Sequence, residues 1–168
     1  MKIGIISDTH DHLENIKKAV DRFNKSGIDI LIHAGDFCSP FVFRELNKLQ
    51  PQCSRAYAVF GNNDGDKVLL TQNAGKFCSI QQGILKIQLE GRKIAVMHYP
   101  DIADELFRSG EFDIVIYGHT HRKRLDFSRG ETSKRIILNP GSCAGYLTDS
   151  PTAAILDLEK MSADIISL

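Results

Sequence analysis

Apolar runs and helical patterns alternate in the first part of the chain. The run from residue 2 to residue 7 is continuously apolar and β-rich, which is typical of a strand buried on both faces. A helical face of apolar side chains follows, and Gly27 ends it. The strand–helix–strand–helix–strand order predicts parallel strands joined by crossover helices. The predicted strands cover residues 2–7, 28–33 and 54–60, and the predicted helices cover residues 13–26 and 41–49.

The second part of the chain is dominated by paired strands. Short polar turns at residues 90–91, 129–130 and 159–160 separate three pairs of apolar runs, which indicates three hairpins. No repeat, low-complexity tract or linker interrupts the pattern. One domain over residues 1–168, with a mixed sheet or two packed sheets, is therefore expected. Its predicted strands cover residues 83–89, 92–97, 112–117, 123–127, 134–138, 153–158 and 163–168, and its predicted helix covers residues 101–109.

Composition excludes several classes of protein. The 168 residues include 21 basic and 21 acidic side chains, so a broad surface for nucleic acid or an anionic membrane is not expected. The apolar run at the N-terminus is too short for a signal peptide, and no stretch approaches the ~20 apolar residues of a membrane span. A cytoplasmic location is therefore expected, with the cysteines as reduced, small apolar side chains. They are Cys38, Cys53, Cys78 and Cys143.

Side chains suited to chemistry follow five of the predicted strands where each strand ends. They are Asp8 and His10, then Asp36, then Asn62, Asn63 and Asp64, then His98, and finally His119 and His121. Ligands of α/β sheets bind beyond the carboxyl ends of the strands, so these side chains should meet at one edge. Each motif alone is weak evidence, since an aspartate after a strand often caps the next helix. The combination indicates a shared site.

The donor atoms of these residues are those of a metal site. In D-x-H and H-x-H, side chains at i and i+2 can converge from a bent loop or share one face of an extended segment. Mixed imidazole and carboxylate donors suit divalent first-row ions better than magnesium. Gly35, Gly61 and Gly118 lie beside the proposed ligands. They allow the backbone to approach the site closely, or they end the strands, and the two roles are compatible.

The motifs D-x-H, G-D, G-N-x-D, H and G-H-x-H, in this order from Asp8 to His121, resemble those of the calcineurin-like metallophosphoesterase superfamily. The resemblance runs from Ser7 to Ser142 and is strongest to the small single-domain YfcE-like phosphodiesterases of bacteria and archaea. It implies an α/β fold, a four-layer α/β/β/α sandwich of two mixed β-sheets flanked by helices. It also implies a metal site at the C-terminal ends of the strands.

The same resemblance implies a ligand set and a reaction. Asp8, His10 and His121 would hold one ion, Asn62, His98 and His119 would hold a second, and Asp36 would bridge them. The cofactors would be two divalent ions, manganese or nickel before iron or zinc. A hydroxide bridging the ions, ~3.5–4 Å apart in such sites, would attack the phosphorus of a small phosphate diester. Family members are often dimeric or larger, so the resemblance is compatible with a homodimer or a higher homo-oligomer, and the sequence leaves the oligomeric state open.

A non-catalytic scaffold that binds a protein partner is the alternative function. One eukaryotic trafficking subunit of the superfamily has this role. Scaffold members tend to lose metal ligands, whereas all seven proposed ligands are present here, which favours catalysis. A nuclease acting on long nucleic acid is disfavoured by the neutral net charge.

The chain departs from the family pattern at Asn63, where many members have a histidine thought to assist the leaving group. Asn63 can donate a hydrogen bond but cannot supply a proton near neutral pH, so aryl leaving groups should be cleaved far better than alkyl ones. His12 is an alternative proton donor, or else a solvated residue at the start of a helix. Asp64 is expected to orient the loop that carries Asn62 and Asn63. Tyr99 replaces the glycine that commonly follows the His98 ligand.

Other polar residues near the motifs have weaker predicted roles. His33 is expected to be a hydrogen-bonded core histidine. Arg122, Lys123 and Arg124 form either a solvated strand edge or a patch that steers an anionic substrate. The turn-forming segment of Asn139, Gly141 and Ser142 either supports the site through backbone contacts or simply makes a turn.

Overall fold

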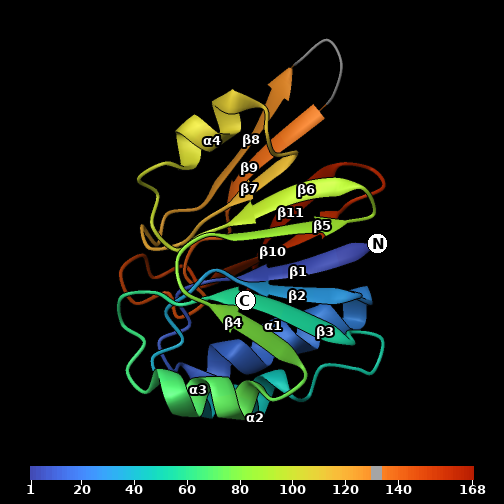
Figure 1. Ribbon diagram of the computed structural model, residues 1–168. Coiled ribbons are helices and arrows are strands. Elements are labelled where there is room, and N and C mark those ends of the chain that lie inside the picture. The colour runs from blue at the N-terminus through green and yellow to red at the C-terminus, as the bar shows by residue number, and fades with distance from the viewer. Residues whose placement is uncertain (130–133) are drawn as a thin grey trace.

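Two β-sheets pack face to face, and helices cover both outer faces (Figure 1). The computed structural model describes residues 1–129 and 134–168, so the predicted turn at residues 129–130 lies partly outside the described residues. The first sheet contains β1 (Lys2–Ile6), β2 (Ile30–His33), β3 (Arg55–Val59), β4 (Cys78–Gln81), β10 (Thr152–Asp157) and β11 (Ser162–Ser167). The second contains β5 (Leu85–Leu89), β6 (Arg92–Val96), β7 (Ile114–Ile116), β8 (Arg124–Arg129) and β9 (Lys134–Asn139). The helices are α1 (Leu13–Ser26), α2 (Phe43–Leu46), α3 (Lys67–Ala74) and α4 (Ala103–Ser109).

Both sheets are mixed. The first has the order β11-β10-β1-β2-β3-β4, in which β1 to β4 are parallel and β10 runs antiparallel to β1. The second has the order β5-β6-β7-β9-β8, in which β6, β7 and β9 are parallel. The expected parallel pairing of the first three strands is confirmed. Because parallel strands end at the same edge of a sheet, the loops after β1, β2 and β3 emerge together.

The apolar core has three layers, as a four-layer α/β/β/α sandwich requires. Ile3 and Ile5 of β1 lie in the cluster between the sheets, together with Ile94 and Ile114 of the second sheet. The alternate side chains along the strands of the first sheet point to its outer face, where they contact α1 and α2. The helix α4 covers a smaller cluster on the outer face of the second sheet. This arrangement explains the uninterrupted apolar residues 3–6 of β1, which are buried on both faces.

The local predictions differ from the structure in places. The predicted helix over residues 41–49 is shorter, because a 3-10 turn (Pro40–Val42) precedes α2 and the amides of Lys48 and Leu49 bond three residues back, as in turns. The helix α3 and the strand β4 were not predicted from the sequence. The first apolar residues of α3 are adjacent rather than helically spaced, and two of them are exposed. The predicted helix over residues 101–109 begins two residues later, so Ile102 precedes α4 and is 43% exposed.

Among the residues described, no helix is long and apolar enough to cross a membrane.

Candidate metal centre

The seven predicted metal ligands lie together at the ends of five strands. The loops that follow β1, β2, β3, β6 and β7 carry them, so strands of both sheets contribute. Their donor atoms face one another in two groups with one carboxylate between the groups. The seven residues are Asp8, His10, Asp36, Asn62, His98, His119 and His121.

The first group contains Asp8, His10 and His121. The Nε2 atom of His121 lies 3.4 Å from Asp8 Oδ1 and 3.3 Å from His10 Nε2. One donor atom from each of these three residues lies close enough to the other two for a single metal ion to bind all three. The structure therefore brings together the three residues expected to hold the first ion.

The second group contains Asn62, His98 and His119. The Oδ1 atom of Asn62 lies 2.9 Å from His98 Nε2 and 2.9 Å from His119 Nδ1. The other ring nitrogen of His98 lies 2.8 Å from the carbonyl oxygen of Ala34, which fixes the ring orientation. A ligand histidine usually donates its second N–H in this way, so the ring of His98 is already set for coordination through Nε2.

Asp36 lies between the two groups. Its Oδ2 atom is 3.6 Å from His10 Nε2, and its Oδ1 atom is 3.4 Å from His98 Nε2. The side chain is 1% exposed, so the carboxylate faces the two groups rather than solvent. One carboxylate oxygen directed at each group is the geometry that a bridging ligand needs.

The backbone is unusual at these positions. Five of the seven residues have positive φ angles, a region that residues other than glycine seldom adopt. Such conformations cost about 1–3 kcal/mol each and cluster at functional sites, where the surrounding structure maintains them. The five are Asp8 (φ 52°), His10 (φ 42°), Asp36 (φ 60°), His119 (φ 65°) and His121 (φ 58°).

Glycines let the backbone approach the ligands closely. A Cβ atom at Gly35 would lie 2.6 Å from Nδ1 of His98, and one at Gly61 would overlap the carboxylate of Asp36. A Cβ atom at Gly118 would overlap the hydroxyl of Ser7. The structure therefore supports close backbone approach at these glycines.

Burial shifts the protonation of the site. Desolvation raises the pKa of Asp8 to about 7, and the nearby carboxylates of Asp36 and Asp64 add to the effect. Desolvation also lowers the pKa of His98 and of His121. These histidines are therefore neutral at pH 7, which is the state in which imidazole binds a metal.

The residues present fit a divalent metal. Their donors are imidazole nitrogens and carboxylate or amide oxygens, a set that suits divalent first-row ions. Asp8 Oδ1 and His121 Nδ1 are buried and have no hydrogen-bond partner among the described residues. A buried oxygen acceptor without a partner is costly in a folded protein unless something else satisfies it. A cation beside Asp8 would satisfy the unpartnered oxygen.

Asp64 holds the loop after β3 in place, as its sequence position suggested. Its carboxylate accepts hydrogen bonds from the backbone N–H groups of Gly61 (2.6 Å) and Cys38 (2.9 Å). Asn63 contacts Asp36 instead. Its Nδ2 donates to Asp36 Oδ2 (2.7 Å) and its backbone N–H donates to Asp36 Oδ1 (2.8 Å). Asn63 thus lies at the site, but with no group that can supply a proton.

The segment after β9 supports the site. The side-chain amide of Asn139 donates to the carbonyl of Gly118 (2.9 Å), just before the ligands that follow β7. The hydroxyl of Ser142 donates to the carbonyl of Asp8 (3.0 Å). Both side chains are fully buried. The segment therefore does more than make a turn, since it fixes two ligand-bearing loops.

Two other histidines have structural roles. His33 is fully buried, and its Nδ1 accepts the backbone N–H of Gly35 (3.1 Å), so the prediction of a satisfied core histidine is confirmed. His12 precedes α1 and accepts the backbone N–H of Asn15 through Nδ1 (3.3 Å). This contact favours the helix-start alternative over a role as proton donor.

Cys38 is a neighbour of the site that sequence reasoning missed. Its sulfur lies 3.3 Å from Nδ1 of His10. Desolvation raises the pKa of the thiol to about 11, so it is protonated at neutral pH. Its position two residues after Asp36 was the available signal. The other three cysteines are buried and reduced, as expected.

The basic triplet after the last ligand divides into two parts. Arg124 pairs with Asp104 (2.9 Å) and Asp126 (2.7 Å), so it belongs to a structural strand edge. Arg122 and Lys123 are exposed and have no ion-pair partner among the described residues. With His121 they line a cavity of about 330 Å³. This side of the centre is therefore cationic.

Two mixed sheets between helical layers, with imidazole and carboxylate donors gathered at the strand ends, define a metal-site protein of the α/β/β/α sandwich class. The chain belongs to the calcineurin-like phosphoesterase superfamily, whose domain model matches residues 1–161. The family and fold expected from the sequence motifs are thereby confirmed.

The similarity to known proteins extends over nearly the whole chain. Phosphodiesterase MJ0936 of Methanocaldococcus jannaschii is 39% identical over 164 residues, which cover 95% of each chain. The solved structure of an archaeal phosphodiesterase has a TM-score of 0.87 and 38% identity, with all of both chains covered. Vps29 of Entamoeba histolytica, solved in complex with Zn²⁺, has the same fold, with a TM-score of 0.70 and 21% identity over 100% of this chain and 98% of that one.

Proposed function

We propose that this protein hydrolyses small phosphate diesters at a centre of two divalent metal ions. The relative that is 39% identical is named a phosphodiesterase, and its similarity extends over 95% of this chain. One observation carries the proposal. The carboxylate of Asp36 directs one oxygen to each of two separate ligand groups, at 3.6 Å and 3.4 Å from their nearest imidazole nitrogens.

In the proposed centre, Asp8, His10 and His121 hold one ion and Asn62, His98 and His119 hold the other. Manganese and nickel are the proposed ions, with iron and zinc as alternatives, since all accept mixed nitrogen and oxygen donors. When bound, the two ions supply an activated water and offset the charge that grows on the phosphoryl oxygens.

The protein's own residues orient the substrate and set its preference. The side-chain amide of Asn63, which contacts Asp36, is exposed at the open side of the site and can donate a hydrogen bond to a phosphoryl oxygen. No protein group at this position supplies a proton to the departing alcohol. The leaving group therefore departs as an anion, which favours acidic alcohols such as phenols.

The test is hydrolysis of a chromogenic aryl phosphodiester by metal-stripped protein, with divalent ions added back singly. Asp36→Asn removes the charge of the proposed bridge, and Asp21→Asn, an exposed residue of α1 paired with Lys17, is the matched control. Turnover that requires a divalent ion, survives Asp21→Asn and falls by at least 100-fold in Asp36→Asn supports the proposal. Absence of turnover with every ion, although metal binds, refutes it in favour of the scaffold alternative.

A further inference from the structure

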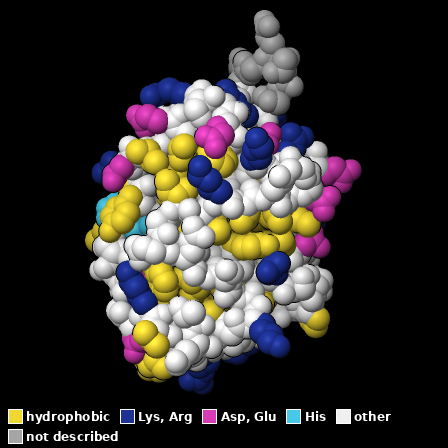
Figure 2. Space-filling view, viewed as in Figure 1, with side chains coloured by type: hydrophobic (Ala, Val, Ile, Leu, Met, Phe, Trp, Pro, Cys, Tyr) yellow, Lys and Arg dark blue, Asp and Glu magenta, His cyan; other side chains and the backbone are white. Residues whose placement is uncertain are grey.

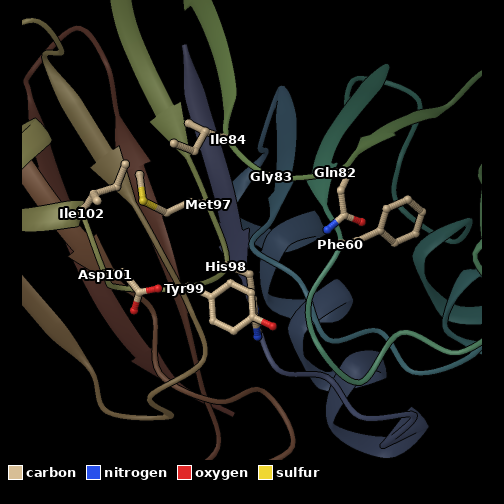
Figure 3. A pocket seen from close by; sticks show the side chains of 9 residues that line it. All are labelled: Phe60, Gln82, Gly83, Ile84, Met97, His98, Tyr99, Asp101 and Ile102. Carbon is tan, nitrogen blue, oxygen red and sulfur yellow. The ribbon is translucent and has the colours of Figure 1, made fainter.

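An apolar cavity shares a wall with the proposed metal centre. It has a volume of about 240 Å³ and lies between the two sheets' strand-end loops, on the side of His98 (Figure 3). His98 is common to both, because its Nε2 faces Asn62 and Asp36 while the residue itself lines the cavity. A group bonded to a phosphorus atom at the centre therefore has a short path into the cavity.

The walls of the cavity are suited to a flat apolar group. Figure 3 shows Ile84, Met97 and Ile102 gathered on one side, with Phe60 on the other and Tyr99 between. The remaining lining residues are His98, Gln82, Gly83 and Asp101. Aromatic rings and a methionine sulfur bind aromatic partners well through stacking, edge and sulfur contacts. An enclosed apolar cavity of about 150 Å³ holds a benzene molecule, so this volume accommodates one aromatic ring.

Tyr99 connects the cavity to the centre. Its ring lies 4.9 Å from the ring of His119 and 5.2 Å from that of His98, both proposed ligands. The side chain is 43% exposed, so it has an open face at the mouth of the cavity. Tyr99 replaces the glycine that commonly follows the His98 ligand in the family. The departure adds an aromatic wall to the site.

The two sides of the centre differ in charge. The cavity on the His98 side has one ionisable side chain besides histidine and tyrosine, the carboxylate of Asp101. The cavity on the His121 side is lined by Arg122 and Lys123. A second anionic group is thus favoured beside His121. Beside His98 the carboxylate of Asp101 is offset by the ammonium of Lys67, which lies 3.0 Å from Gln82 Oε1, so this side carries no excess of positive charge. Figure 2 shows histidine at the left margin of the molecule, bordered by hydrophobic side chains on this face.

We infer that the cavity beside His98 binds an uncharged aromatic ring carried by one ester group of the substrate. The inference rests on the proposed function and names its substrate class, a phosphodiester of which one alcohol is aromatic. The ring enters between Tyr99 and Ile102, and the other ester group extends toward Arg122 and Lys123. The phosphoryl group itself stays at the centre.

Two phosphinates that cannot be hydrolysed separate ring binding from catalysis. Methyl(phenyl)phosphinate and dimethylphosphinate carry the same single charge and differ in the ring alone. Their affinities for the Mn²⁺-loaded full chain are measured by calorimetry. The phenyl compound is expected to bind at least 10-fold more tightly, since each apolar group in a fitted pocket discriminates by about 10-fold or more.

The variant Ile102→Trp fills the mouth of the cavity and is expected to bring this affinity ratio close to one. Phe127→Trp is the matched control, because Phe127 is 40% exposed, close to the 43% of Ile102, and does not line the cavity. A ratio near one in the wild-type protein, or a ratio that survives Ile102→Trp, overturns the inference. Hydrolysis of an aryl phosphodiester is measured in the same samples. Intact hydrolysis without a phenyl preference refutes the cavity alone, whereas metal binding without hydrolysis refutes the proposed function.

Discussion

Replacing Asp8 with asparagine is expected to stabilise the metal-free protein at alkaline pH. Asp8 is fully buried, and desolvation raises the pKa of its carboxyl group from 3.8 to about 7. Asparagine has nearly the same shape, carries no charge and tolerates the positive φ of 52° at this position. The variant should therefore keep the loop conformation while removing the free-energy penalty of a buried anion.

The size of this stabilisation follows from the pKa shift. The folded-state pKa lies above the unfolded value, so the proton is bound more tightly in the folded protein. The stability that this proton contributes is complete below about pH 4 and is lost as the pH rises through about 7. A shift of about three units corresponds to about 4 kcal/mol, so Asp8→Asn should gain about 4 kcal/mol at pH 8 and about 1.5 kcal/mol at pH 5.

Urea unfolding in the presence of a chelator measures the free energy of unfolding at both pH values. A shift of the midpoint at an unchanged m-value gives the stabilisation. Asp21→Asn, on the exposed face of α1, should change the free energy of unfolding by less than about 0.5 kcal/mol at either pH. With metal at 1,000 times its dissociation constant the advantage of the variant at pH 8 should disappear, because the wild-type protein alone gains about 4.1 kcal/mol from binding. A variant no more stable than wild type at pH 8, or a gain that does not change with pH, would show that the buried Asp8 carboxylate does not destabilise the metal-free protein.

Three further expectations concern the site. Gly61→Ala should lower metal affinity at least 10-fold, because its Cβ would overlap the carboxylate of Asp36. Gly65→Ala is the control, since a Cβ there meets its nearest atom at an ordinary 3.5 Å. Calorimetric metal titration of the two variants checks this. Asn63→His should raise the rate on an alkyl diester relative to a matched aryl diester by about 10-fold or more, by restoring a proton donor, in steady-state assays. Replacing Arg122 and Lys123 together with alanine should lower kcat/KM by about 3- to 10-fold at low salt and have little effect at high salt, since exposed charges are screened.

Each of these has a contradicting result. Equal metal affinity of the two glycine variants would mean that the loop after β3 can move away from Asp36. Wild-type rates that are equal on matched aryl and alkyl diesters, with chemistry rate-limiting, would show that a proton donor is already present. A loss of kcat/KM in the double alanine variant that persists at high salt would point to direct contact rather than steering.

The meeting of the proposed ligands at one edge was predictable because it depends on local sequence and on one topological rule, whereas their assignment to two ions came from the family resemblance. Parallel strands end at the same edge, so Asp8, Asp36 and Asn62 had to meet once their strands were recognised. The helix α1 was equally predictable, since its apolar positions recur with helical spacing and Gly27 ends it in the left-handed conformation (φ 64°). Glu90 and Gly91 both have positive φ, as the predicted two-residue hairpin requires.

Other features could not be read from the sequence because they depend on tertiary contacts. Within α3, Val68 and Leu69 are exposed and Leu70 alone of the three is buried, so the sequence shows no helical periodicity. The contact of Cys38 with His10 requires the loops after β1 and β2 to be placed first. The cavity beside His98 likewise combines Phe60 with residues from the segments 82–84 and 97–102, which lie far apart in the sequence and meet only in the folded chain.

The most direct test of a centre with two metal ions is a stepwise Mn²⁺ titration of metal-stripped protein. Bound ions per chain and the rate on an aryl phosphodiester are measured in the same samples. Two ions per chain are expected, with turnover that rises as the second ion binds, because Asp36 faces both ligand groups. Full turnover at one ion per chain, or none at two, would contradict this expectation.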